Sequence, residues 1–461
     1  MGRGVFELKK RQLLLALGLI FASIIAIAYG FASLVLKNIF QAALSAIASV
    51  ILGFPLAYAI IGKGFLSRIL RVFSLVPLVL PQPLMILSLV LLFGANGDFS
   101  LPFSLYSLWG IIFAHALYNF PLASRIIAQK LGNSRELERV GKSLGANSIQ
   151  AFMQITLPSL KPAIISAFTI AFAFSFTSFS IPLVFGGISN TTLEVEIFRS
   201  FFRNFEFGRG LVIAVLQILI FLPVAFSLKI IPWKIGASSG FGKMADLIAI
   251  PYLLIFATIF FYPYSKISIG NFANVPIINS FLLATVSSMI CMLLWLAISK
   301  RAGNLPLLII GVSPAALAVG FFYLPYSFIV LAIGHAILAL PLVGILLSSH
   351  RESILILKKT AKSLGANRWQ AFWEIEIPLL KGPLALAFAF SFMFSIGETA
   401  FVSSLSQGFE TVSTSLILSF STYRFSMGYS YSFVLMFLSL AFSAMLEGLN
   451  VFGMQNKKIV P

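Results

Sequence analysis

The sequence predicts an all-α integral membrane protein with about twelve transmembrane helices, arranged as two parallel six-helix repeats. Three observations lead to this fold class. First, 59% of the 461 residues are apolar and only 10% are charged, whereas soluble domains carry about 25% charged residues. Second, apolar runs long enough to span a bilayer, about 17–25 residues each, recur along the whole chain. Third, a polar sequence occurs twice, as KSLGANSIQAF from Lys142 and as KSLGANRWQAF from Lys362.

The apolar runs have helical length, and they lack the alternating pattern of a membrane β-barrel, so each is expected to be a helix. Proline and polar residues interrupt the third, fourth, ninth and tenth runs. The twelve expected spans are centred near Phe21, Ala48, Leu87, Asn119, Ala171, Leu219, Ile255, Ile290, Ala316, Leu338, Phe390 and Leu438.

The first apolar run could be a signal peptide, because it follows a basic stretch and because Ala26 and Ala28 resemble a cleavage site. The run continues to about Leu36, beyond these small residues. We therefore favour a retained helix.

The basic charge of the chain, +18 at neutral pH, follows the expected topology. With the N-terminus in the cytoplasm, all but six of the 32 Lys and Arg residues fall on the cytoplasmic side. The six are Lys37, Arg199, Arg203, Arg209, Lys266 and Arg424. This asymmetry matches the positive-inside rule and predicts that both termini are cytoplasmic. Because topology accounts for the charge, we expect no nucleic-acid partner.

The chain is an internal repeat. Residues 115–180 align with residues 335–400 without a gap, at a constant offset of 220. Each half contains an even number of expected spans, so both halves face the same way and their symmetry axis runs along the membrane normal. We expect a first half at 1–228, a cytoplasmic linker at 229–245 and a second half at 246–461.

Each copy of the repeated polar sequence encodes a helix end followed by a helix start. Gly145 can adopt the positive φ that ends a helix, and Asn147 supplies an N-cap with Gln150 at capping-box spacing. Pro158 is expected to end the new helix near Ile155. The second copy repeats these signals with Gly365, Asn367, Gln370 and Pro378.

The apolar residues of these short helices have the i, i+3, i+4 spacing of a single helix face. They are Ile149, Phe152 and Met153 in the first copy and Trp369, Phe372 and Trp373 in the second. Such a face could pack beneath the protein's own helices. Its duplication favours docking on two equivalent partner surfaces instead.

The spacing Gly145-x9-Ile155-x-Leu157-Pro158 resembles the cytoplasmic EAA loop of type I ATP-binding-cassette importer permeases. The second copy is similar, with Gly365, Ile375, Ile377 and Pro378. The Glu-Ala-Ala of the motif is absent, since Arg139-Val140-Gly141 and Lys359-Thr360-Ala361 take its place. In that family the short helix is a coupling helix that fits a groove on an ATPase subunit.

The resemblance implies a fused, two-copy permease with the type I importer fold, in the cytoplasmic (inner) membrane. Its partners would be an ATPase dimer on the cytoplasmic side, an extracytoplasmic substrate-binding protein and membrane lipid. It implies a transport subunit and not an enzyme, with no catalytic residues. The stretch GASSGFGKM lacks the first glycine and the Ser or Thr of a Walker A loop, having Ala237 and Met244 instead, so a separate ATPase chain is expected to bind ATP. We therefore expect no cofactor on this chain.

The fifth span of each half has a polar middle that makes it a candidate substrate pathway. These residues are Ser175, Thr177 and Ser178 in the first half, and Ser395, Gly397, Glu398 and Thr399 in the second. Small hydroxyls could line a path or satisfy backbone carbonyls. A carboxylate deep in a span needs a cavity or a partner, and we favour a pathway role for Glu398 over a structural salt bridge.

The aligned His115 and His335 lack the converging ligands of a metal site, so no metal is expected. Packing or hydrogen bonding between the halves is the favoured interpretation for both.

The outer segment 186–217 resembles the corresponding stretch of fused thiamine-importer permeases, with Gly-Gly, Thr-Thr-x-Glu, Arg and Gln in order. Fused ferric-iron permeases share this architecture and are the alternative, since an acidic Glu398 suits thiamine or a metal cation. An alternative of another class is an ATP-independent secondary transporter with parallel repeats. That class would leave the duplicated apolar helices without a role.

Overall fold

The computed structural model describes residue 23 and residues 30–79, 82–187, 189–227, 242–261, 274–298, 309, 312–322, 324, 327–405, 408–422 and 424–455. The regular structure within these ranges is helical. The expected span near Phe21 and most of the expected linker lie outside the described residues.

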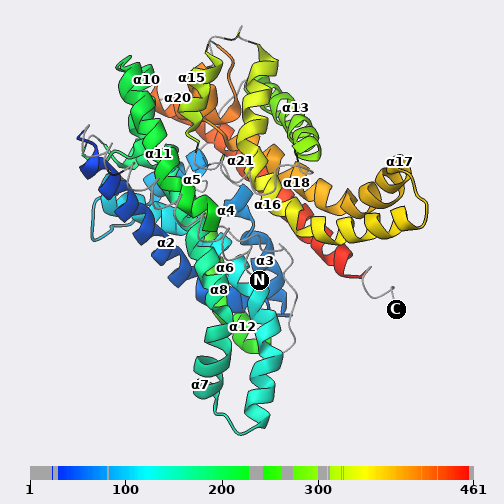
Figure 1. Ribbon diagram of the computed structural model, residues 1–461. Coiled ribbons are helices and arrows are strands. Elements are labelled where there is room, and N and C mark those ends of the chain that lie inside the picture. Colours follow the sequence, from blue (N-terminus) through cyan, green and yellow to red (C-terminus); the bar gives the residue numbers. More distant parts are fainter. Residues whose placement is uncertain are drawn as a thin grey trace.

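A triangle of three mutually packed helices forms the core of each half (Figure 1). In the first half these are α2 (Ala32–Ile60), α6 (Leu108–Ser143) and α8 (Leu157–Phe176). In the second half they are α13 (Asn274–Ile298), α16 (Phe328–Ser363) and α18 (Ile377–Gly397). Small residues allow close packing. A Cβ atom on Gly53 of α2 would lie only 2.7 Å from the Phe120 carbonyl oxygen of α6, so the two backbones nearly touch.

Seven helical segments in the described ranges are long and apolar enough to cross a membrane. They are Ala32–Ile60, Leu108–Gly132, Ser148–Phe176, Phe207–Val224, Asn274–Ile298, Ala371–Gly397 and Ser426–Met445. Three further expected spans correspond to shorter apolar helices, Gln82–Phe93, Met244–Phe260 and Phe328–Gly344. The span expected near Ala316 corresponds to an eight-residue helix, α15 (Pro314–Phe321). Ser313 caps it and Pro314 begins it, as is usual at helix N-termini.

Four of these segments belong to α5 (Gln82–Phe93), α11 (Phe207–Ser227), α12 (Gly242–Phe260) and α21 (Phe425–Gln455). The helices between the spans are α3 (Phe65–Phe73), α4 (Val76–Val79), α9 (Ser180–Phe185), α10 (Leu193–Phe202), α19 (Ala400–Leu405) and α20 (Val412–Ser421).

The helix α12 begins at Gly242, within the expected linker, and packs against α2, α3 and α5 of the first half. The Phe256 ring stacks on Phe120 with the centroids 5.6 Å apart, and the Tyr252 hydroxyl donates to the Leu52 carbonyl oxygen at 2.6 Å. The packing unit therefore crosses the boundary between the two halves of the sequence.

Candidate functional site

The long helix α6 ends at the first copy of the polar sequence in a glycine-based cap. Gly145 has a φ of +95°, and the Ala146 amide donates to the Gly141 carbonyl oxygen at 3.1 Å. This is the pattern of a Schellman cap. The equivalent Gly365 has a φ of +92°. The sequence-based prediction of a positive φ is confirmed at both glycines.

A capping box then starts a new helix in each copy. The Gln150 amide donates to the Asn147 side chain at 2.8 Å, and the Asn147 amide donates to the Gln150 side chain at 3.1 Å. The second copy has the same two bonds between Asn367 and Gln370, at 2.9 and 2.8 Å. The predicted caps are therefore confirmed.

The expected stop at Pro158 is wrong. The short helix α7 (Ser148–Ala151) continues through a π-helical turn, η1 (Phe152–Thr156), directly into α8. The Leu157 amide donates to the Phe152 carbonyl oxygen, as a π turn requires. Pro158 is tolerated because it occupies the first turn of α8, where its missing N–H does least harm.

The second copy continues in the same way. The helix α17 (Arg368–Gln370) leads through the π turn η4 (Ala371–Glu376) into α18, and Pro378 lies in the first turn of α18. Each long helix, its turn and the returning helix thus form a hairpin.

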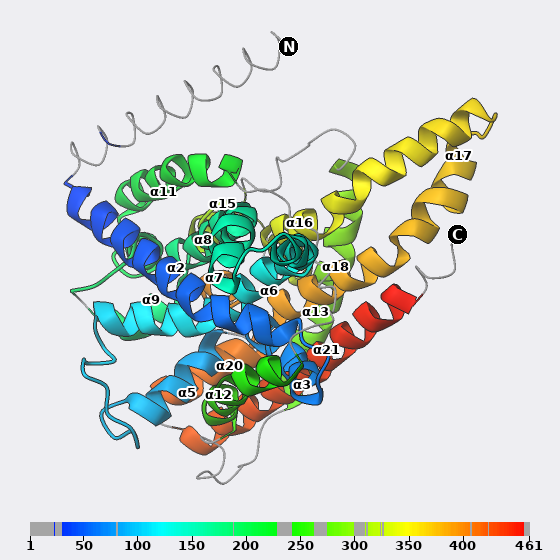
Figure 2. The same cartoon turned by 90° about the horizontal axis from the view of Figure 1, so that it is seen from below.

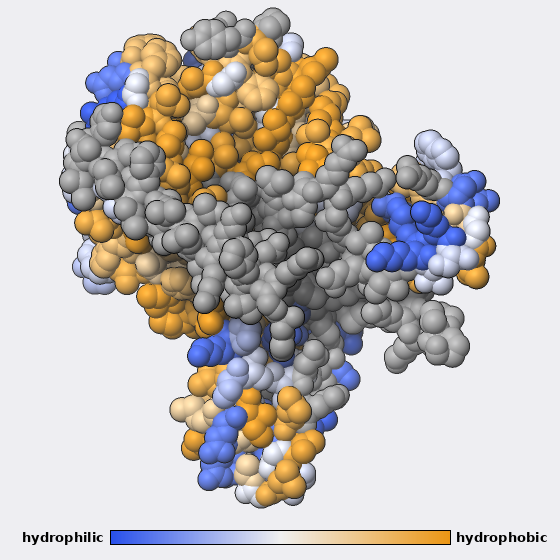
Figure 3. All heavy atoms as spheres, viewed as in Figure 1, coloured by the Kyte–Doolittle hydropathy of each residue, from blue (hydrophilic) through white to orange (hydrophobic). Residues whose placement is uncertain are grey.

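Both hairpins project from the helical body, with α7 at the bottom and α17 at the right of Figure 1. In the view from below, α7 lies near the middle and α17 lies at the edge (Figure 2). The two tips therefore point in different directions. The tip of the first hairpin mixes hydrophilic and hydrophobic side chains, whereas the coloured surface of the body above it is mainly hydrophobic (Figure 3).

The tips expose large apolar side chains. Ile149 is 74% exposed and Met153 56%, while Trp369 is 71% exposed and Trp373 60%. These four side chains are free to contact a partner.

Phe152 and Phe372 do not belong to this exposed surface. Phe152 is half-buried, and its ring meets Phe54 of α2 edge-on at 6.4 Å between centroids. Phe372 is half-buried and packs edge-on against Trp373 at 5.2 Å. The expected single apolar face is divided between the partner side and the protein's own side.

Two leucines at the tips were missed by the sequence analysis. Leu144 and Leu364 are 83% and 84% exposed, more than any other large apolar side chain in the described ranges. They occupy equivalent positions in the identical letters KSLGAN, and this identity was the signal that could have revealed them.

The second part of the candidate site is the pair of helix breaks that follow α8 and α18. The helix α8 ends at Phe176 before α9 begins at Ser180, and α18 ends at Gly397 before α19 begins at Ala400. Non-helical backbone at membrane depth is tolerated only where protein buries it or water lines it. The two breaks touch, since Ser180 Oγ lies 3.0 Å from Thr399 Oγ1.

Glu398 lies in the second break and is 8% exposed. Its carboxylate accepts bonds from the amides of Phe401, at 2.9 Å, and Val402, at 3.3 Å, and so caps α19. His335 Nε2 lies 3.5 Å from the same carboxylate. The partners of this acid therefore come from its own half.

The other pathway candidates separate into three groups. Ser178 lies at the first break and donates to Gln82 at 3.3 Å, and Gly397 directly precedes Glu398. Thr177 donates to the Ala173 carbonyl oxygen at 3.0 Å, as a helix-satisfying hydroxyl does. Ser175 and Ser395 are buried inside the helix triangles.

His335 bonds Ser395 directly, whereas His115 reaches the Ser175 backbone only through Gln41. His335 Nδ1 lies 2.7 Å from Ser395 Oγ. His115 Nδ1 lies 2.9 Å from Gln41 Nε2, and the same Gln41 nitrogen donates to the Ser175 carbonyl oxygen at 3.4 Å. The expected hydrogen bonding between the halves is wrong for the bonds of His115 and His335 described here, because both have partners in their own half.

A different acid, Glu194 of α10, joins the halves. Its carboxylate is fully buried and accepts bonds from Ser313 Oγ at 2.7 Å and Gln217 Nε2 at 2.9 Å. Ser313 belongs to the second half, at the start of α15. Burial raises the pKa of Glu194 from 4.5 to about 7, against the opposing effect of these hydrogen bonds. The sequence analysis did not assign it a role.

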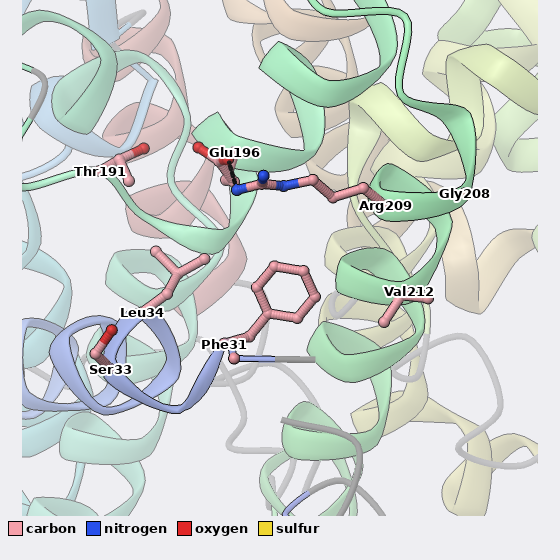
Figure 4. A pocket seen from close by; sticks show the side chains of 9 residues that line it. Phe31, Ser33, Leu34, Thr191, Glu196, Gly208, Arg209 and Val212 are labelled. Carbon is pink, nitrogen blue, oxygen red and sulfur yellow. Dashed lines mark hydrogen bonds and ion pairs between the residues drawn. The ribbon is translucent and has the colours of Figure 1, made fainter. Parts of the chain in front are cut away.

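A cavity of about 710 Å³ lies where α2, α10 and α11 begin. Figure 4 shows Glu196 and Arg209 pointing toward one another across it, above the Phe31 ring. Arg209 Nη2 lies 2.7 Å from Glu196 Oε1, and its guanidinium carbon lies 5.6 Å from the ring centroid. The two charges of this cavity are thus paired with each other. Across the described ranges, no group of three or more His, Cys, Asp or Glu side chains could hold a metal ion.

Comparison with known proteins gives a consistent result. Residues 49–237 match the family described as the binding-protein-dependent transport system inner membrane component. The chain is 26% identical to the thiamine transport system permease protein ThiP of Haemophilus influenzae, over 79% of this chain and 78% of that protein. It is 26% identical to ThiP of Escherichia coli, over 89% of this chain and 88% of that protein. A probable sulfate transport system permease protein, cysT, of a Helicosporidium species is 28% identical over 41% of this chain and 76% of that protein. No solved structure matches the chain.

Proposed function

We propose that this chain, which is a fused permease of the type I ATP-binding-cassette importers, moves thiamine across the cytoplasmic membrane. The substrate proposal is supported by relatives named as thiamine permeases that match 79% and 89% of the chain. A binding protein would deliver thiamine from outside, and a separate ATPase would supply the energy. This chain would bind no nucleotide itself.

The observation that carries the mechanism is the pair of capped, apolar hairpin tips. We place the docking site of an ATPase dimer there, one subunit on Leu144 and Ile149 and the other on Leu364 and Trp369. Because the tips point in different directions (Figures 1 and 2), docking both on one dimer requires the halves to turn relative to each other. Such a turn would transmit ATP-driven movement to the membrane part.

We place the substrate path at the contact between the two helix breaks, beside Thr399 and Ser180. Glu398 lies next to this contact and would attract a cationic solute by its charge. In this proposal the chain spans the membrane twelve times, as two parallel six-helix halves at 1–228 and 246–461 with a linker at 229–245. Both termini are cytoplasmic.

Uptake into proteoliposomes tests the function. The chain is reconstituted with its ATPase and binding protein, and labelled thiamine and labelled Fe³⁺ are offered separately, with enclosed ATP or with an ion gradient alone. We expect thiamine uptake that requires ATP and is absent with Walker-inactivated ATPase. Uptake of Fe³⁺ alone would identify a ferric-iron permease, and uptake driven by the gradient without ATPase would contradict the importer assignment.

Labelling tests the topology separately. Ser143 and Ser363 are exposed at the two tips, and single cysteines at these positions should react with a membrane-impermeant maleimide only in inside-out vesicles. Labelling of either position in intact cells would contradict the orientation.

A further inference from the structure

In each hairpin a side-chain bond joins the two legs at an equivalent position, but with different chemistry. In the first hairpin, Thr156 of η1 donates to Glu138 of α6 at 3.3 Å. The Ser134 and Ser159 hydroxyls, 2.6 Å apart, also join the legs of this first hairpin. In the second, Lys358 of α16 pairs with Glu376 of η4. The offset of 220 that relates the repeats takes residue 138 to residue 358 and residue 156 to residue 376. The position of the bond is therefore repeated, although its residues are not.

The acids of both bonds are partly shielded from water. Glu138 is 20% exposed, Glu376 is 12% exposed and Lys358 is 25% exposed. Glu138 also pairs with Lys142 one turn along α6, at 2.8 Å. Ion pairs that are partly buried are screened less by salt than fully exposed ones, so the pair of Lys358 and Glu376 is screened less than a surface ion pair.

The legs also pack closely beside the first bond. A Cβ atom on Gly141 would clash with Ile155 Cδ1, so the side chain of Ile155 lies directly over the backbone of α6. The segment between Glu138 and Thr156 contains the two points where the hairpin departs from α-helix. These are the left-handed Gly145 and the π turn η1. A bond across them removes the freedom that both would otherwise give the tip.

We propose that these two bonds are clamps that hold each hairpin tip rigid against its long helix, and that Glu138, Thr156, Lys358 and Glu376 are positioning residues for coupling. This proposal rests on the proposed docking of an ATPase at the tips. The glutamate position of the EAA loop holds Arg139 and Lys359 in this chain. Each clamp nevertheless contains a carboxylate. In the first hairpin it is Glu138 of the long helix α6, and in the second it is Glu376 of the π turn η4.

A rigid tip is required because a flexible one would absorb movement of its partner. A force on Leu144 or Leu364 would bend the hairpin at the glycine and the π turn instead of moving α6 or α16. With the clamp closed, the tip and the long helix move as one body. A displacement of the tip would then be transmitted along the helices to the break at the other end of α8 or α18.

Charge exchange within the second hairpin tests the clamp. The variants are Lys358→Glu, Glu376→Lys and the double exchange, and the control is Lys381→Glu, an exposed lysine of α18 that undergoes the same change of charge. We expect each single exchange to lower ATP-dependent uptake about fivefold, because like charges then face each other across the legs. The double exchange should regain at least half of the uptake, and the control should match wild type.

Hydrogen exchange of the purified chain, without ATPase, provides the second measurement. Amides of residues 368–380 should exchange about fivefold faster in each single variant and return to the wild-type rate in the double exchange. The corresponding transplant, Glu138→Lys with Thr156→Glu, installs the second clamp in the first hairpin and should preserve both uptake and protection of residues 148–160.

The outcomes separate the clamp from the proposed function. Single variants with wild-type exchange rates, or a double exchange that rescues neither measurement, would overturn the clamp. Rescued protection together with ATP-independent uptake in the wild type would leave the clamp as a feature of the hairpin but reject its role in coupling, and with it the importer mechanism.

Discussion

Ser180 and Thr399 are 219 residues apart in the chain, yet their hydroxyl oxygens lie 3.0 Å from each other. Thr399 lies in the break between α18 and α19, and Ser180 begins α9 directly after the break that follows α8. The halves thus meet where both helices are interrupted. A rotation of one half against the other would therefore change the distance between these two hydroxyls.

A disulfide across this contact should block transport. Cys291 is the only cysteine of the chain and it is buried, so the double variant Ser180→Cys, Thr399→Cys adds the one pair of thiols placed to react with each other. Oxidation should close the pair and reduce thiamine uptake more than about tenfold, because the breaks could no longer separate. Mild reduction should restore uptake.

The two single cysteine variants serve as controls and should be insensitive to oxidation. Full uptake after complete cross-linking of the double variant would show that the solute does not pass between the breaks.

The tip leucines should anchor the ATPase. Leu144→Ala and Leu364→Ala should each weaken ATPase binding by about 2 kcal/mol, about thirtyfold, as expected when a central apolar anchor is truncated. Binding to the purified permease in nanodiscs can be measured by interferometry. The control is Leu254→Ala on α12, because Leu254 is likewise an exposed leucine, at 63%, but lies away from the tips. Equal affinity of all three variants and wild type would place the docking site away from the tips.

The glycine that ends the long helix of each hairpin should be required because its φ is positive, and not because a side chain would clash there. A Cβ atom at Gly365 would meet nothing within 4 Å, but φ there is +92°. Gly365→Ala should therefore destabilise the end of α16 by about 1 kcal/mol, seen as about fivefold faster hydrogen exchange near residues 360–370.

Gly208→Ala is the matched control, because Gly208 is equally open and has no positive φ. If Gly365→Ala and Gly208→Ala both leave local exchange unchanged, the backbone at residue 365 does not require glycine.

The bond between Ser313 and Glu194 should stabilise the association of the halves. Ser313→Ala removes a donor from a buried carboxylate and should destabilise the protein by about 1–3 kcal/mol, visible as a lower midpoint of thermal unfolding. Ser313 also caps α15, and Ser327→Ala, which removes only the corresponding cap of α16, measures that part separately. A loss no larger than that of Ser327→Ala would exclude a role for the bond.

The effect of Ser313→Ala should depend on pH. The pKa of Glu194 is raised in the folded protein, from 4.5 to about 7, so its proton favours folding fully below about pH 4.5 and this contribution is lost as the pH rises through about 7. The ionised carboxylate present above pH 7 needs the Ser313 donor most. The destabilisation by Ser313→Ala should therefore increase between pH 6 and pH 8, and a constant difference would contradict this view of Glu194.

The sequence alone determined the features that depend on neighbouring residues. Apolar runs of spanning length predicted helices, and seven long spans are present in the described ranges. Gly145, Asn147 and Gln150 predicted a helix end and a capping box, because a positive φ and a side-chain cap are local requirements. The repeat itself could be read directly from two stretches of nearly identical letters.

Tertiary structure decided what depends on packing between distant segments. Pro158 does not stop the helix, because a π turn accommodates it. Phe152 turns toward Phe54, and Leu144 is left exposed in its place. Glu194, which the sequence marked only as part of Thr-Thr-x-Glu, is a buried acid that accepts a bond from Ser313 of the other half. A carboxylate or an aromatic ring carries the same chemistry anywhere in a chain, and its burial and partners, which determine what it does, are fixed only when separate helices pack together.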